Sequence, residues 1–176
     1  ELAERLALAG LEVGAVDEIG AWWDRDKIVV GEIREIRPHP DADRLVLADV
    51  LYGSPEIEQC VTGAPNLFQY KGVGPISLKV AFAMEGAELY DGHQEGFVKT
   101  RLKRTKIRGV PSRAMVCSEK ELGISDAHEG IMILPPDAPV GMPLVDYLGD
   151  TVWDIDLTPN LARCLNMIGV AREVAA

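Results

Sequence analysis

The sequence predicts a mainly β protein with some α: a closed or nearly closed β-barrel carried between two helix-bearing flanks. Short β-rich segments bounded by Gly, Pro and Asp follow one another from residue 28 to residue 147. The helical patterns lie in residues 1–27 and 148–176, and neither flank is long enough to bury a core alone. We therefore expect residues 1–27 and 148–176 to pack together as one split subdomain, into which the barrel of residues 28–147 is inserted.

Most of the predicted strands are short β-branched runs that stop at a turn sequence. They are expected at residues 28–37, 45–52, 57–62, 76–84, 114–117, 131–134 and 151–157, with a further extended segment at residues 97–108. Pro38-His39-Pro40-Asp41 and Gly63-Ala64-Pro65-Asn66 are the strongest turn signals. Residues 76–84 give the clearest strand, because apolar residues alternate with small or polar ones and leave one face apolar.

Helices are predicted mainly in the flanks. Apolar residues recur at helical spacing over residues 2–9, and a capping box at residues 118–121 predicts one short helix within the β region. A turn of helix is expected after Pro143, and Thr158-Pro159-Asn160 is a helix-start signal. The apolar spacing that follows predicts one last helix with a face made of Leu161, Leu165 and Ile168.

Composition places the chain among globular proteins. Its 176 residues are 47% hydrophobic and 26% charged, which excludes disorder, collagen and coiled coil as whole-chain descriptions. No apolar run reaches the roughly 20 residues that cross a bilayer. There is no initiator Met and no leader, and both ends fall inside helical patterns, so we expect a piece of a longer chain.

Cysteine usage and the absence of familiar catalytic motifs limit the kinds of catalytic or metal site that the sequence can be expected to form. Cys60, Cys117 and Cys164 are few and widely spaced, which argues against a disulfide framework or a zinc site and favours a cytoplasmic protein. No glycine-rich phosphate loop and no nucleophile elbow are present. The Asp41/Asp43 and Asp154/Asp156 pairs are interpreted as structural. The sequence therefore shows no catalytic centre and no metal site.

Charge is distributed very unevenly. The net charge is −10, which by itself argues against nucleic-acid binding. Yet residues 99–108, here called the basic segment, contain six of the 18 basic residues and no acidic residue. Lysines also protect exposed strand edges, but one or two suffice for that. Six like charges packed closely repel one another, which favours a role in holding a polyanion at one place.

Four sequence blocks resemble the tRNA-binding OB (oligonucleotide/oligosaccharide-binding) domain of aminoacyl-tRNA synthetases and associated tRNA-binding proteins. The blocks are His39-Pro-Asp-Ala-Asp-Arg-Leu45, Gly63-Ala-Pro-Asn66, Lys106-Ile-Arg-Gly-Val110 and Ser112-Arg-Ala-Met-Val-Cys-Ser-Glu-Lys-Glu-Leu-Gly123. The resemblance implies an OB-fold Greek-key β-barrel over most of residues 28–147.

The flanks resemble the phenylalanyl-tRNA synthetase β-subunit family. Leu8-Ala-Gly-Leu-Glu-Val13 and Asp154-Ile-Asp-Leu-Thr-Pro-Asn160 carry this resemblance, together with Cys164-Leu165 and residues 169–175. In that family the barrel is inserted into a small split N-terminal subdomain. The chain departs from the family pattern at four positions, where Gly, Arg, Asp and Ser are usual. These positions are Ala114, Leu161, Arg163 and Asn166.

The resemblance implies a parent α₂β₂ ligase that attaches phenylalanine to its tRNA with ATP and Mg²⁺. Its active site lies in the α subunit, so this chain is expected to be non-catalytic and to hold no cofactor or metal of its own. The expected partners are tRNA and the α subunit, without membrane or DNA. The predicted tRNA contacts are Arg44, Asn66, Lys99, Arg101, Lys103, Arg104, Lys106, Arg108, Ser112 and Met115.

Two other interpretations stay open. The chain is alternatively a structural module that braces the α₂β₂ assembly, with the basic segment paired to acidic groups on a neighbour. A free-standing tRNA chaperone is the third possibility. Because aromatic residues are few near the basic segment, we expect little base stacking of the single-strand OB type.

Overall fold

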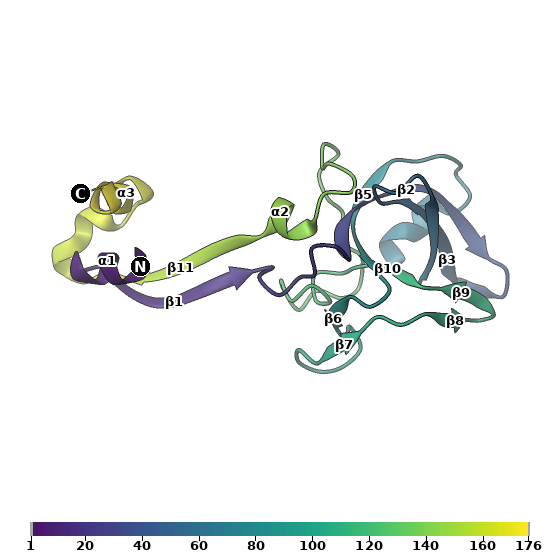
Figure 1. Cartoon of the computed structure of the whole chain (residues 1–176), viewed down its shortest axis with the longest axis horizontal. Helices are drawn as coiled ribbons and strands as arrows, with labels where there is room; N and C mark the ends of the chain where they lie inside the picture. The colour runs from purple at the N-terminus through teal and green to yellow at the C-terminus, as the bar shows by residue number, and fades with distance from the viewer. Residues whose placement is uncertain (1, 176) are drawn as a thin grey trace. The chain divides into compact units, whose positions relative to one another are not determined.

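The computed structural model describes residues 2–175 and divides them into two units. The first unit comprises residues 2–18 and 150–175, which are far apart in the sequence and come together in space. The second comprises residues 19–149 and contains the five-stranded sheet seen at the right of Figure 1. Among the described residues, no helix is both long and apolar enough to cross a bilayer.

The second unit is built on an antiparallel sheet in the order β10-β5-β2-β3-β4. These strands are β2 (Ile28–His39), β3 (Ala42–Leu51), β4 (Ile57–Thr62), β5 (Leu78–Met84) and β10 (Ala114–Val116). β2 is long enough to pair with β5 through residues 28–33 and with β3 through residues 32–39. Two register shifts in its pairing with β3 mark irregularities of the kind that bend a strand, as closure of a small barrel requires.

Two contacts hold the edge strands β4 and β10 near each other. The backbone N–H of Val61 in β4 donates to the Ser112 hydroxyl (3.2 Å), and that hydroxyl donates to the carbonyl of Ala114 in β10. Arg113, just before β10, forms a two-pronged ion pair with Glu58 of β4. The sheet is therefore nearly closed, as the sequence predicts.

The sheet separates two apolar clusters that hold this unit together. One lies inside the barrel around Ile33, Phe82 and Val50, and it includes Leu67 from the 3₁₀ helix η1 (Pro65–Tyr70). The other lies on the opposite side, where Trp23 and Leu144 of α2 (Leu144–Leu148) meet the outer residues of β2 and β5. Alternation along β5 supplies both clusters, which explains why residues 76–84 give so clear a strand signal.

Four short strands complete this unit, and two of them lie within the basic segment. β6 (Glu88–Tyr90) pairs with β7 (Lys99–Arg101), and β8 (Thr105–Ile107) pairs with β9 (Val110–Ser112). The extended segment predicted for residues 97–108 is therefore two strands separated by Leu102-Lys103-Arg104. Both pairs are antiparallel and lie outside the five-stranded sheet.

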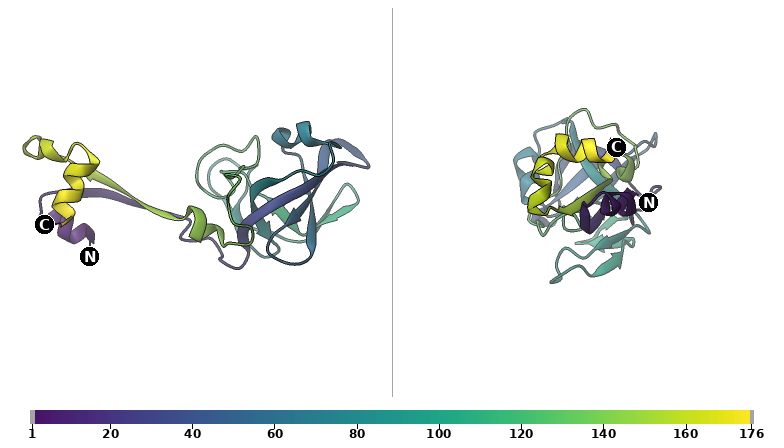
Figure 2. Two further views of the ribbon diagram at one scale, coloured as in Figure 1. Left: turned by 90° about the horizontal axis from the view of Figure 1, so that it is seen from above. Right: turned by 90° about the vertical axis from the view of Figure 1, so that its left-hand side faces the viewer.

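The first unit combines one strand pair with the helices. β1 (Glu12–Ile19) and β11 (Asp150–Asp156) run side by side, and Figure 2 shows α1 (Leu2–Leu8) and α3 (Met167–Ala175) near the same end of this pair. Leu6, Leu11, Leu161 and Cys164 form its buried core. Trp153, Ile155 and Leu157 pack against this core.

The division between the units differs from the predicted boundaries at both junctions, by nine residues at the first and by two, Leu148 and Gly149, at the second. Residues 19–27, expected in the flank, belong to the barrel unit. Trp23 explains this, because its side chain is 4% exposed and its indole N–H donates to the carbonyl of Leu122 (2.9 Å). Residues 11–23 show neither strand alternation nor helical spacing in the sequence, so local patterns do not predict β1 or the burial of this tryptophan.

Three other expectations about local structure are wrong. Residues 131–134 form only a single bridge, Val80 to Ile133, rather than a strand. Residues 118–121 keep the capping-box hydrogen bonds but form turns rather than a helix. The last helix is broken, because η2 (Pro159–Cys164) ends before α3 begins at Met167, and this leaves Leu165 and Ile168 exposed.

The departures from the family pattern have local roles in the structure. Leu161 is buried in the core of the first unit, and Arg163 forms an ion pair with Glu173 (2.8 Å). The Asn166 amide oxygen accepts the backbone N–H of Gly169 (2.8 Å), which caps α3 at its start. Ala114 is buried in the barrel core.

Candidate nucleic-acid interface

The basic segment is fixed at its middle and its charged side chains point outward. Leu102 anchors it, since its backbone N–H donates to Ala87 and its carbonyl accepts from Gly86 (both 2.8 Å) while its side chain packs against the outer apolar cluster. The basic side chains on either side of Leu102 are all exposed. A short stretch of backbone thus displays six cations without burying any of them.

The first two cations of the segment have intramolecular partners. Lys99 and Arg101 both lie 3.7 Å from Glu88, which faces them across the β6–β7 pair. The Lys99 ammonium also lies 4.9 Å from the ring centre of Trp22, a cation–π distance. These ion pairs are long and solvent-exposed, so each contributes little to stability and is easily exchanged for another anion.

The other four cations are free. Within residues 2–175, Lys103, Arg104, Lys106 and Arg108 make no ion pair and no side-chain hydrogen bond. We call these four residues the free cations. A protein of net charge −10 thus leaves four neighbouring positive charges without an acidic partner among its described residues.

The β8–β9 hairpin that carries two of the free cations is held by buried polar groups. Its two-residue turn is Arg108-Gly109, with φ of 47° and 85°, the left-handed geometry of a tight hairpin turn. His39, only 6% exposed, accepts the Asp41 backbone N–H at Nδ1, so its Nε2–H donates to the Ile107 carbonyl (3.1 Å). Ser112 attaches the other arm to β4. The turn is therefore presented on a fixed base.

The four predicted contacts outside the basic segment have different surroundings. Arg44 is exposed at the start of β3 and has no side-chain partner among residues 2–175. Asn66 uses its amide to join η1 to Ile131, donating to that residue's carbonyl (2.9 Å) and accepting its N–H (3.2 Å). Ser112 is 5% exposed, so its hydroxyl positions the hairpin and does not face solvent. Met115 is half-buried.

A cavity of about 430 Å³ lies beside the hairpin and is lined by residues of all four sequence blocks. Its walls include residues 63–65, Ile107, residues 128–131 and four residues of the last block, Met115, Val116, Ser118 and Glu121. Leu45, next to Arg44, also lines it. The blocks that are separate in the sequence therefore converge on one hollow of the surface.

Glu121 is a partly buried acidic group of this cavity. Burial raises the pKa of its carboxyl, while hydrogen bonds from the backbone N–H (2.7 Å) and hydroxyl (3.0 Å) of Ser118 oppose that rise. Both bonds end on Oε2, and Oε1 accepts none among the described residues. A carboxyl group with one unused acceptor atom therefore lines the cavity.

Comparison with known proteins identifies the barrel. Residues 28–143 match the family model described as "Putative tRNA binding domain", which is well over half of the chain. The chain belongs to this tRNA-binding domain family. The matched range coincides with the predicted barrel at its start and stops four residues short of its predicted end.

Full-length relatives extend the match to the whole chain. The chain is 48% identical over 176 residues to the phenylalanine–tRNA ligase beta subunit of Dehalococcoides mccartyi (strain ATCC BAA-2266 / KCTC 15142 / 195) and 46% identical over 178 residues to that of Syntrophus aciditrophicus (strain SB). Each match covers all of this chain and 20% of the relative, so the chain spans about a fifth of their length. Among solved structures, the C-terminal domain of Plasmodium vivax p43 is similar over 66% of this chain and 58% of its own, with 24% identity and a TM-score of 0.42.

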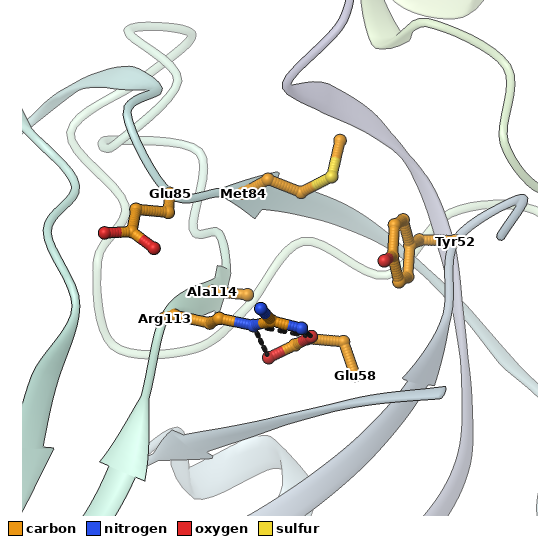
Figure 3. A pocket seen from close by; sticks show the side chains of 6 residues that line it. All are labelled: Tyr52, Glu58, Met84, Glu85, Arg113 and Ala114. Carbon is orange, nitrogen blue, oxygen red and sulfur yellow. Dashed lines mark hydrogen bonds and ion pairs between the residues drawn. The ribbon is translucent and has the colours of Figure 1, made fainter. Parts of the chain in front are cut away.

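A second, smaller pocket of the tRNA-binding domain is dominated by an internal ion pair. It has a volume of about 200 Å³ and lies among Tyr52, Met84, Glu85, Arg113 and Glu58 (Figure 3). The Glu58 carboxylate raises the pKa of Arg113 and occupies its guanidinium. This arginine is therefore committed to closing the barrel rather than offered to a ligand.

Sequence reasoning missed several residues around the basic segment of the tRNA-binding domain. Trp22 and Tyr90 stack edge-to-face at 4.9 Å, and Tyr90 contacts Phe97 at 5.1 Å in the same manner. Trp22 is 75 residues from Phe97 in the chain, so no local pattern joined them. Glu88 was equally hidden, because its partners lie on another strand. Within residues 2–175, no group of three His, Cys, Asp or Glu side chains is arranged to hold a metal ion.

Proposed function

We propose that this chain is a non-catalytic tRNA-binding module that holds the sugar-phosphate backbone of a folded tRNA. The observation that carries the proposal is the set of four free cations, Lys103, Arg104, Lys106 and Arg108, on an otherwise acidic protein. Cations that lack an internal carboxylate partner are available to phosphate. The family match supports RNA as the source of that phosphate.

The arrangement favours backbone contact over sequence reading. Guanidinium and ammonium groups bind phosphate oxygens without distinguishing bases. They are exposed on a segment fixed at Leu102 and at the hairpin turn, so they form a fixed row rather than a mobile tail. Lys99 and Arg101 join the row when phosphate displaces Glu88, and exposed Arg44 extends it toward β3.

Asn66, Ser112 and Met115 act differently in this proposal. The amide of Asn66 and the hydroxyl of Ser112 are occupied by internal hydrogen bonds, so they position the surrounding loops. Met115 lines the cavity next to the hairpin. We therefore assign direct phosphate contact to the cations alone.

At the level of the whole protein, we infer that this module belongs to the β chain of a cytoplasmic phenylalanine–tRNA ligase with an α-subunit partner. The relatives that match the entire chain carry that name. ATP and Mg²⁺ would serve the ligase reaction elsewhere in the assembly. The module would contribute auxiliary contacts to tRNA during aminoacylation.

The test compares two double variants that remove equal charge. K103Q/R104Q removes two free cations, and R5Q/R172Q removes two exposed arginines from the other unit. Filter binding to tRNA at about 0.1 M salt is expected to weaken by roughly 50- to 100-fold in the first variant, since it loses two phosphate contacts and each costs close to a factor of ten there. R5Q/R172Q is expected to bind like the unmodified chain.

The competing role as a brace has its own outcome in the same experiment. If tRNA binding is absent, or equally weak in both variants, while the chain captures the α subunit of a relative ligase, the basic segment serves protein assembly. Loss of that capture in K103Q/R104Q would assign the free cations to a protein partner and refute the tRNA-binding proposal.

A further inference from the structure

The cavity lies next to the hairpin that carries two of the free cations. Ile107 lines the cavity, and its sequence neighbours Lys106 and Arg108 are two of those cations. Consecutive phosphates and bases of RNA are joined by a few bonds only. A strand held on the hairpin can therefore turn one base toward the cavity. This step rests on the proposed function.

The cavity has the size and walls of a site for a small ring. Its volume of about 430 Å³ falls in the range of ordinary ligand sites. Apolar side chains of Leu45, Val61, Ile107, Met115 and Ile131 line it. Apolar walls of this kind suit the face of a heterocyclic base that has left its stack.

Two histidines add planar groups to this lining. His93 and His128 come from different loops, both are exposed, and both line the cavity. The loop that carries His93 is held in place by the buried Lys120 ammonium, which donates to the carbonyls of Gly92 (3.3 Å) and Gln94 (2.8 Å). Imidazole rings stack on nucleobases in RNA-binding proteins.

The carboxyl of Glu121 determines which bases fit. Its Oε2 accepts both the N–H and the hydroxyl of Ser118, which fixes the orientation of the group. Its Oε1 accepts no hydrogen bond among residues 2–175. An ionised carboxylate only accepts hydrogen bonds, so it binds an amino group and repels a carbonyl oxygen.

We propose that this cavity binds a single unstacked nucleobase that carries an exocyclic amino group, with Glu121 accepting a hydrogen bond from that group. Cytosine, adenine and guanine satisfy this requirement, whereas uracil offers a carbonyl oxygen at the position where cytosine has its amino group. The module thereby distinguishes bases at one position while it holds phosphates without regard to sequence.

Cytidine and uridine hexamers test the proposal, because the two bases have the same size and differ at this group. The unmodified chain is expected to bind hexacytidine about fivefold more tightly than hexauridine at pH 7.5, the effect of about 1 kcal/mol. In Glu121→Gln the amide oxygen keeps the Ser118 bonds, which turns the NH₂ group toward the cavity as a donor. The cytidine preference is then expected to vanish or reverse.

Glu95→Gln serves as the matched control, because it removes the same charge from an exposed position on the neighbouring loop. It is expected to keep the cytidine preference. Intrinsic differences between the two oligonucleotides affect every protein alike. The quantity compared between proteins is therefore the ratio of the Kd for hexauridine to the Kd for hexacytidine. An unchanged preference in Glu121→Gln, or the absence of any preference in the unmodified chain, would refute the base site.

A second measurement keeps the test independent of the variant's folding. In the unmodified chain, the ring NMR signals of His93 and His128 are expected to shift with cytidine monophosphate and much less with uridine monophosphate or inorganic phosphate. Equal shifts with all three would overturn the proposal and indicate a phosphate site. Failure of the proposed function looks different, since the hexamers would then show no salt-dependent binding to the free cations at all.

Discussion

Replacement of Glu32 by Gln tests how the barrel keeps its central strand in register. Glu32 is 6% exposed and accepts hydrogen bonds from Ser77 (2.6 Å), Lys79 (2.9 Å) and Arg34 (3.0 Å). Lys79 lies directly opposite it in the β2–β5 register, and its side chain is only 13% exposed. Glu32→Gln leaves this ammonium facing a neutral amide, without its counter-charge.

The size of the effect follows from the pKa of Glu32. The Ser77 hydroxyl and the Lys79 ammonium lower that pKa from its ordinary 4.5 to about 2. A shift of this size corresponds to about 3 kcal/mol of folding free energy at neutral pH. Because the folded-state pKa is depressed, this stabilisation is present above pH 4.5 and is lost as the pH falls toward 2.

Urea denaturation from pH 7 to pH 2, followed by circular dichroism, measures this dependence. We expect Glu32→Gln to be less stable than the unmodified chain by about 2–4 kcal/mol at pH 7, and the difference to shrink to below about 1 kcal/mol near pH 2. Glu35→Gln removes a charge from an exposed position of the same strand and is expected to cost less than about 0.5 kcal/mol. A difference for Glu32→Gln that stays constant with pH would refute the reasoning.

Three further outcomes follow from the packing of the barrel. Asn66→Ala is expected to lower the free energy of unfolding by about 1–3 kcal/mol, because two backbone groups of Ile131 lose their hydrogen-bond partner. The tRNA affinity of the folded protein is expected to stay unchanged. A variant as stable in urea as the unmodified chain would contradict this. Gly31→Ala is expected to cost about 1–3 kcal/mol, since a Cβ there would lie 2.8 Å from Val50, and a stabilised variant would show the contact to be wrong. Burial raises the pKa of Cys60 to about 12, so iodoacetamide at pH 8 is expected to leave it unmodified until urea unfolds the chain; rapid native-state labelling at Cys60 would count against its burial.

Local patterns predicted most of the barrel because its strands obey them. Alternation of apolar residues over residues 76–84 predicted a strand, and the two faces of β5 pack in different apolar clusters. β4 begins and ends at the residues that the sequence predicts. The concentration of charge in the basic segment predicted a positively charged surface, and all six basic residues of the segment are exposed in the structure. These features depend on neighbours in the sequence, which a sequence pattern records.

The rest depended on contacts between distant residues. The Ser118–Glu121 capping box formed its hydrogen bonds, yet the chain turned away from helix because Tyr90 and Lys120 bind the surrounding backbone to other loops. Leu165 interrupts the last helix, since Asn166 caps a new one. The division of the cations into paired and free also required the structure, because Glu88 faces Lys99 only through the β6–β7 pair.

The salt dependence of tRNA binding tests the central claim most directly. The four free cations are expected to contribute roughly −3 to −4 to the slope of log K against log salt concentration. The quadruple variant K103Q/R104Q/K106Q/R108Q is expected to lose about that much of the slope, whereas R5Q/R172Q keeps it. A quadruple variant whose slope and affinity match those of the unmodified chain would show that the free cations do not hold RNA.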